Sequence, residues 1–188
     1  MNYELLSPTS KILLPSTKTF LVPYTAAMAQ EVFIKNDEQS SMQLFGLQTA
    51  EDAQRFKTTI FSSNDYRTCM LFTICHEEKV IGSCNFHIWI PKHFRAEIGY
   101  MLDEQYRNKG IMKEAVKNVL NYGFEKMGLN RVEAFVGHEN IPSLKLVTHF
   151  GFQKEGVMRE HYFKNDRLED SVCFSLLRRE YELQKTSG

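Results

Sequence analysis

The stretch from Phe94 to Met127 constrains the fold of this 188-residue chain more than any other. From Phe94 to Leu102 the residues alternate between two faces, which is the two-residue period of a strand. From Met112 to Met127 apolar residues recur at steps of three and four, which is typical of an amphipathic helix. The stretch therefore predicts a strand, a short loop and a helix packed on one side.

The loop between them is basic and has a glycine where the helix should start. The first backbone N–H groups of a helix have no partner within it and lie at the positive end of the helix dipole, so they bind phosphate well. Neither G-x-x-x-x-G-K-[ST] nor G-x-G-x-x-G fits the loop, which excludes the two common nucleotide motifs. We therefore expect another phosphate-bearing ligand. The predicted loop residues are Arg107, Asn108, Lys109, Gly110, Ile111 and Met112.

This loop resembles the [QR]-x-x-G-x-[GA] pyrophosphate loop of the GNAT N-acetyltransferases. Arg107 and Gly110 match the first two fixed positions, and Met112 stands where Gly or Ala is usual. The phrases IGYML, NKGIMKEA, NRVEAFV, HENIPSLKL, GFQKEGVMRE and LEDSV are similar to the branch that acetylates ribosomal-protein N-termini (RimJ/RimL-type), where that loop position is often bulkier. The resemblance covers roughly Thr19 to Tyr181.

The resemblance implies acetyl-CoA as co-substrate, bound where the central strands splay. Besides the loop, it implies that the backbone of Tyr100, Met101 and Leu102 holds the pantetheine arm and the acetyl carbonyl. It also implies that Asn140 bonds the pantetheine, that Ser143 lies near the sulfur and that Lys145 meets a cofactor phosphate, although an exposed helix lysine is the commoner explanation for Lys145.

The whole chain predicts a single domain of the α+β (mixed α/β) class, residues 1–188, with residues 1–18 as an irregular or extended lead-in. We expect a twisted, mostly antiparallel sheet with helices on both faces. The connector Asn36–Gln48 is a substrate lid or a plain surface loop. The expected strands are Thr19–Tyr24, Thr68–Cys75, Val80–Trp89, Phe94–Leu102, Arg131–Val136, Phe152–Phe163 and Leu168–Leu177, and the expected helices are Ala26–Ile34, one after Thr49, Met112–Met127 and Ile141–His149.

The composition limits the kinds of partner and ligand that we expect for this protein. Lys plus Arg equals Asp plus Glu, and no block of like charge occurs, so we expect no direct nucleic-acid or membrane contact. We expect a cytoplasmic protein without signal peptide, either monomer or homodimer. The cysteines and histidines lack metal-ligand spacing, so we expect no metal, buried apolar cysteines and structural or surface histidines. They are Cys69, Cys75, Cys84, Cys173, His76, His87, His93, His138, His149 and His161.

Acetyl transfer to an amine needs a base for the ammonium proton and an acid for the departing thiolate. For the base we favour Glu160 over Glu97, and either carboxylate could instead be structural. Tyr162 follows Glu160 on the same strand face, where a phenol could align the amine or serve as acid. Many family members carry a tyrosine as acid at the position of Val147, so Ser143 is the nearest replacement, unless it is simply a polar residue of a first helical turn.

The best acceptor candidate is a protein N-terminal α-amine, possibly that of a ribosomal protein. Such an amine, with a pKa near 8, keeps an appreciable neutral fraction at pH 7, which a lysine amine does not. Two alternatives remain open: a small amine such as a polyamine, amino sugar or antibiotic, and a module that binds acyl-CoA without turnover.

Overall fold

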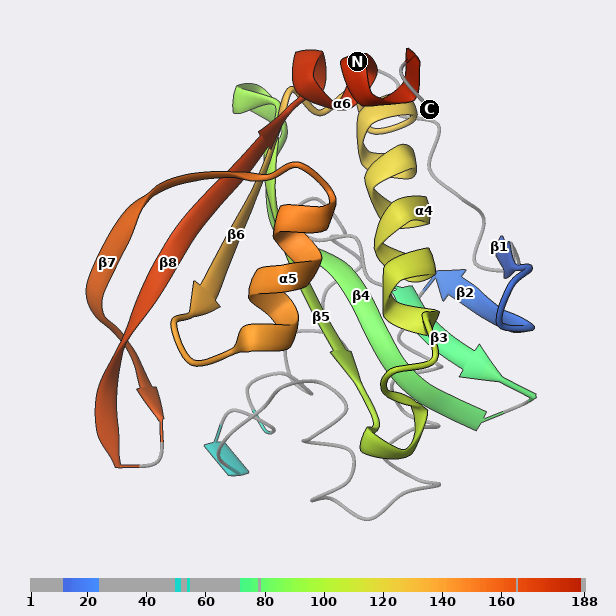
Figure 1. The fold of residues 1–188 in the computed structure, drawn as a ribbon, viewed down its shortest axis with the longest axis horizontal. Helices are drawn as coiled ribbons and strands as arrows, with labels where there is room; N and C mark the ends of the chain where they lie inside the picture. The colour runs from blue at the N-terminus through green and yellow to red at the C-terminus, as the bar shows by residue number, and fades with distance from the viewer. Residues whose placement is uncertain are drawn as a thin grey trace.

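The computed structural model describes residues 12–23, 50, 51, 54, 72–77, 79–164 and 166–186. Eight strands form one sheet in the order β1-β2-β3-β4-β5-β6-β8-β7 (Figure 1). The strands are β1 (Ile12–Leu14), β2 (Thr19–Pro23), β3 (Phe72–His76), β4 (Lys79–Ile90), β5 (Arg95–Leu102), β6 (Arg131–Gly137), β7 (Gln153–Lys164) and β8 (Arg167–Leu177). The helices are α4 (Ile111–Glu125), α5 (Ile141–His149) and α6 (Arg178–Thr186), with 3-10 turns η2 (Pro91–His93) and η3 (Glu104–Tyr106).

The strand pairing confirms a mixed, mainly antiparallel sheet. Among the described strands, β5 and β6 are the one parallel pair, joined by α4 as the crossover that the sequence predicts. Helices α4 and α5 lie on the same face of the sheet (Figure 1). The helix expected at Ala26–Ile34 lies outside the described residues. Of the helix expected after Thr49, residues 50, 51 and 54 are described, and all three are helical.

The core lies between α4 and the central strands. Ala96 and Ile98 on β5 are buried, and Ala115, Val119 and Leu120 form the buried stripe of α4. This agrees with the alternation and the helical period read from the sequence. Since both elements end at the loop 103–110, packing of their apolar faces fixes where that loop lies.

Two elements were not among the expected strands and helices. Residues 12–14, in the lead-in expected to be irregular or extended, form the short strand β1, in which Leu14 is fully buried and the segment pairs with β2. Helix α6 was not expected: it has no fully buried residue, so no apolar stripe marks it in the sequence. The strand expected to start at Thr68 is described only from Phe72, and residues 68–71 lie outside the described part.

Candidate active site

The central feature of the sheet is a gap between β5 and β6. The two strands pair only at Arg95↔Arg131, Ala96↔Val132 and Glu97↔Glu133, after which they diverge (Figure 1). Residues 98–102 of β5 and 134–137 of β6 therefore do not pair with each other. Backbone groups that line such a gap are available to an extended amide ligand. The segment Tyr100–Leu102, expected as a pantetheine rail, lies on this unpaired half of β5.

The N-terminus of α5 follows the gap-lining end of β6. The Asn140 carboxamide caps this helix by accepting the Ser143 N–H at 3.3 Å. Ser143 is partly buried, and Val147, at the position of the family's tyrosine, is buried and cannot donate a proton. The structure thus places Asn140 and Ser143 together, and it gives Asn140 a capping role.

A phenol reaches the same place from β5. The Tyr100 hydroxyl is buried and makes no hydrogen bond of ordinary geometry among the described residues, yet the Ser143 hydroxyl lies near enough to influence it. Burial raises the pKa of Tyr100 to about 12, while Ser143 acts in the opposite direction. Tyr100 therefore remains a neutral proton donor beside Ser143 at physiological pH. The sequence indicates a role only for the backbone of Tyr100 and gives no signal for its side chain.

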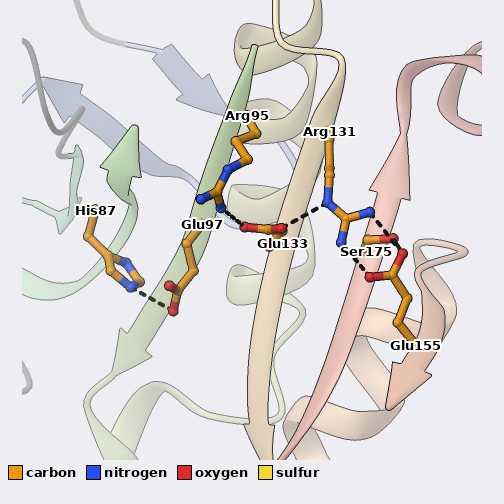
Figure 2. Close-up of polar contacts among 7 residues, drawn as sticks. All are labelled: His87, Arg95, Glu97, Arg131, Glu133, Glu155 and Ser175. Atoms are coloured by element: carbon orange, nitrogen blue, oxygen red, sulfur yellow. Dashed lines mark hydrogen bonds and ion pairs between the residues drawn. The ribbon is translucent and has the colours of Figure 1, made fainter. Parts of the chain in front are cut away.

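The opposite face of β5 carries a carboxylate, Glu97, that pairs with a histidine. Glu97 is only 7% exposed, and its Oε1 lies 2.9 Å from Nε2 of His87 on β4 (Figure 2). Tyr162 on β7 lies within the electrostatic reach of Glu97: burial raises the pKa of the phenol, and the negative charge of Glu97 raises it further. The structure therefore brings Glu97 and Tyr162 into one region, together with His87, which the sequence predicts to be a structural or surface histidine.

Next to Glu97, ion pairs hold the paired half of the two strands. Glu133 binds Arg95 and Arg131, and Arg131 also binds Glu155, in a chain that crosses the sheet (Figure 2). Ser175 donates a hydrogen bond to Glu155 at 2.6 Å. The Arg131 guanidinium and then Ser175 lower the pKa of Glu155 to about 2. The strands are therefore tied by charge up to Glu97 and are released beyond it.

Asn108 and Gly110 give the phosphate loop its shape. They have φ values of 60° and 78°, in the left-handed region that glycine tolerates best. A Cβ on Gly110 would meet no atom of the described residues within 4 Å, so these residues leave the space beside the backbone open. Gly110 precedes the first turn of α4 and has no side chain to cap it. This fits a bound phosphate group.

Two basic residues of the loop are engaged by the protein itself. Arg107 donates from Nε to the Leu102 carbonyl at 3.2 Å and also pairs with Glu104. The Lys109 ammonium lies 5.3 Å from the centre of the Tyr106 ring. Arg107 thus ties the loop to the end of β5, next to the gap. Ile111 is buried and Met112 packs on the core, so these two contribute backbone N–H groups.

Glu160 and Lys145 stand apart from this arrangement. Glu160 is exposed at an irregular part of β7, with φ of 52° and its N–H bonded to Asp170 at 2.8 Å. Lys145 is exposed on α5. Neither residue has a described contact with Glu97, Tyr100 or Ser143.

A second concave region runs along the outer side of α4. It is an open groove of about 1030 Å³ that starts at the phosphate loop and reaches α6. Its lining includes Lys109, Gly110, Lys113, Lys117, His149 and Lys185. Its lining includes none of residues 98–102 or 134–137, which border the gap between β5 and β6.

Residues 18–153 match the family model described as the acetyltransferase (GNAT) domain. This chain belongs to the GNAT acetyltransferase family. The mixed sheet with diverging central strands agrees with the fold that the family resemblance implies; it has eight strands among the described residues, where the sequence predicts seven.

Relatives with curated names include several acetyltransferases. The chain is 46% identical over 104 residues to the uncharacterized N-acetyltransferase p20 of Bacillus licheniformis, covering 55% of this chain and 58% of that protein. It is 30% identical to the ribosomal-protein-serine acetyltransferase of Escherichia coli K12, over 53% of this chain and 56% of that protein. It is 27% identical to the spermidine N(1)-acetyltransferase of the same strain, over 51% and 52%. These matches span little more than half of each relative.

Solved structures agree over a longer range. The ribosomal-protein-S5-alanine acetyltransferase from Vibrio fischeri superposes with a TM-score of 0.73 at 20% identity, covering 92% of this chain and 98% of that one. RimJ of Mycobacterium smegmatis, in complex with CoA-disulfide, superposes with a TM-score of 0.69 at 19% identity, covering 91% and 87%. At these identities the likeness establishes the GNAT fold.

The described residues meet neither the requirements of a metal site nor those of a membrane-spanning helix. In the described part of the chain, no cluster of three or more histidine, cysteine or acidic side chains could hold a metal ion. Likewise, the described helices include none with the length and apolarity needed to cross a bilayer.

Proposed function

We propose that this protein transfers the acetyl group of acetyl-CoA to a primary amine, and that the amine is a protein N-terminal α-amine. One observation carries the proposal: at the point where β5 and β6 part, Glu97 lies on one face of β5, and Tyr100 and Ser143 lie on the other. A proton acceptor and proton donors therefore stand on opposite sides of one opening. Transfer from a thioester to an amine needs this separation, because the amine must lose a proton to one group and the thiolate must gain a proton from another.

The loop supports binding of the CoA diphosphate. Residues Asn108 to Met112 present backbone N–H groups at the start of α4, and the open space beside Gly110 lets a phosphate approach them. Arg107 fixes the loop to Leu102, the last residue of β5, so a ligand held by the loop can extend along Tyr100–Leu102 into the gap.

The Ser143 hydroxyl is our proposed donor to the thiolate. It lies in the first turn of α5, whose N-terminal partial positive charge stabilises a developing anion. The Tyr100 phenol beside it, kept neutral by burial, supports the same role from β5.

On the amine side, we assign the base carboxylate to Glu97 in preference to Glu160. Glu97 is buried next to the point of divergence and influences Tyr162, whereas Glu160 is exposed on β7. Glu97 can act directly on the amine or through a group that it holds. Tyr162 is placed to align the incoming amine.

The charge of this face favours an N-terminal amine over a polycation. Glu133 lies opposite Glu97 across the β5–β6 pair, and both Glu133 and Glu155 are neutralised by arginines. No surplus of negative charge is therefore built here among the described residues. The alternative acceptor, a small polyamine, is supported by the similarity to a spermidine acetyltransferase.

A thiol-release assay tests the proposal. Acetyl-CoA is mixed with peptides that begin with Ser, Ala or Met, with their N-acetylated counterparts as blanks, and with spermidine. We expect release above the hydrolysis rate with at least one free N-terminal peptide. Faster release with spermidine than with every peptide would show that the acceptor is a polyamine and not an N-terminal amine. CoA binding without release for any amine would indicate a non-catalytic acyl-CoA-binding module.

A further inference from the structure

We propose that the group that takes the proton from the amine is the His87 imidazole, with Glu97 as the carboxylate that orients it. The inference rests on the proposed function and adds the identity of the proton acceptor. It begins with the placement of His87, which three separate features of the fold produce.

The first feature is a β-bulge. The pairing of β4 with β5 shifts register between Phe86 and Ile88, so His87 is the extra residue with no partner on β5. Two successive exposed side chains, His87 and Ile88, replace the alternation of the strand at this point. Bulges commonly re-aim a side chain beside an active site.

The second feature is a glycine on the neighbouring strand. A Cβ on Gly99 would lie 2.6 Å from Cε1 and 2.7 Å from Nδ1 of His87, closer than atoms can pack. The imidazole therefore occupies the space that any other residue at position 99 would fill. This places the ring directly over β5, two residues beyond Glu97 toward the gap.

The third feature is the difference in burial within the pair. The Glu97 side chain is 9% exposed and that of His87 is 42% exposed, with 2.9 Å between Oε1 and Nε2. A carboxylate only accepts hydrogen bonds when ionised, so the pair favours the tautomer with the proton on Nε2. The lone pair then lies on Nδ1, because the hydrogen bond of His87 within the described residues is made through Nε2. A carboxylate that orients an imidazole in this way produces a general base.

The proton balance is complete without another reactant. As the amine nitrogen bonds to the acetyl carbon, Nδ1 of His87 takes one N–H proton, directly or through a water molecule. The C–S bond then breaks, and the thiolate takes the proton of the Ser143 hydroxyl, which regains a proton from solvent. The imidazolium, stabilised by Glu97, releases its proton to solvent through its exposed edge.

Other charged groups surround the pair but do not replace it. Arg95 is engaged by Glu133, and burial raises the pKa of both Tyr162 and Cys173, with Glu97 adding to each effect. A neutral phenol and a neutral thiol at pH 7 are poor bases. The groups contributed by each neighbouring strand are Arg95 from β5, Glu133 from β6, Tyr162 from β7 and Cys173 from β8.

Nitrogen-detected NMR of histidine side chains tests the geometry without any acceptor. In the full-length protein we expect His87 to be the Nε2–H tautomer at high pH, and we expect Glu97→Gln to change its tautomer balance. A His87 found as the Nδ1–H tautomer, or unaffected by Glu97→Gln, would overturn the inference.

Kinetics test the chemical role, with whichever peptide or spermidine the wild-type protein acetylates. His87→Gln keeps an N–H donor for Glu97 and should still lower kcat/KM about 10²- to 10⁴-fold, with the imidazole limb lost from its pH profile. His87→Ala should regain activity with added imidazole. His93→Gln, at an exposed histidine of η2, is the matched control.

A second variant guards against a folding artefact. Gly99→Ala leaves His87 and Glu97 in the chain but displaces the ring, so it should also lower kcat/KM. If His87→Gln retains wild-type kcat/KM while the wild-type protein turns over, Glu97 acts alone and the inference fails. Absence of turnover by the wild-type protein would instead refute the proposed function.

Discussion

The two halves of the β5–β6 pair have the same strand geometry but opposite surroundings. In the paired half, Arg95, Arg131 and Glu133 join the strands by ion pairs as well as by the ladder. In the unpaired half, no ladder joins the strands, and Tyr100 meets Ser143 of α5 in the space between them. The sheet is thus held rigidly up to Glu97 and opened beyond it. The difference indicates that the charge network fixes the edge of the opening, and we propose that the chemistry occurs in the opening itself.

If the opening is the reactive half, removing its base carboxylate should have the largest effect. Glu97→Gln should lower kcat/KM by about 10²- to 10⁴-fold, because it removes either the base or the group that orients it. Steady-state kinetics at several pH values measure this effect. Glu160→Gln, at an exposed position outside the opening, is the comparison. A larger loss of kcat/KM in this variant would show that Glu160 on β7 is the base.

The loop that feeds the opening should control cofactor affinity. Gly110→Val should weaken acetyl-CoA binding at least about 100-fold, since a side chain would occupy the space beside the helix N-terminus and the backbone at φ of 78° would be strained. Isothermal titration calorimetry gives the affinity, and circular dichroism checks the fold.

Gly128 is the matched control for this change. It lies just after the other end of α4, with φ of 66° and equally open space. Gly128→Val therefore carries a similar backbone strain of about 1–2 kcal/mol without touching the loop. Near-native affinity in a folded Gly110→Val protein, or equal loss in both variants, would contradict the phosphate-loop assignment.

The thiolate side of the opening should affect turnover and leave binding intact. Ser143→Ala should lower kcat by roughly 10- to 1,000-fold, the range of one proton-transfer or charge-stabilising contact. Acetyl-CoA affinity should change little, since the loop and backbone supply most of it. A loss confined to KM would show uniform binding. An unchanged kcat, with chemistry rate-limiting, would move the acid role to Tyr100, Tyr162 or water.

The paired half should affect stability more than turnover, and only slightly. Glu155→Gln should destabilise the protein by less than about 1 kcal/mol at pH 7, because this ion pair is partly exposed and screened. The pKa of Glu155 falls from its ordinary 4.5 to about 2, so its stabilisation is present above about pH 4.5 and is lost as the pH falls toward 2. Urea unfolding of both proteins between pH 7 and 3 should show a difference that shrinks as the pH falls.

The sequence predicted the framework well where one physical signal dominates. Alternation and helical period predicted β5 and α4, and the glycine before α4 lies at the start of that helix. The sequence did not predict the short or polar elements, because β1 has three residues and α6 has no buried stripe. The roles of Glu97, Glu160 and Ser143 stay predictions.

His87 shows why the site was harder to predict than the fold. A bulge changes the face that a residue occupies, and its position depends on pairing with a strand distant in sequence. The histidine opposite Gly99 could have been found only by aligning β4 with β5 residue by residue. The Tyr100 phenol likewise depends on the position of α5, which lies some 40 residues further along the chain.

A crystal structure with bound CoA tests the central claim most directly. We expect the diphosphate on the first-turn N–H groups of α4. We expect the sulfur in the gap between residues 98–102 of β5 and 134–137 of β6, within hydrogen-bond distance of the Ser143 hydroxyl. CoA lying with its sulfur in the groove along α4 beside Lys113 and Lys117, away from Glu97 and Ser143, would contradict the account.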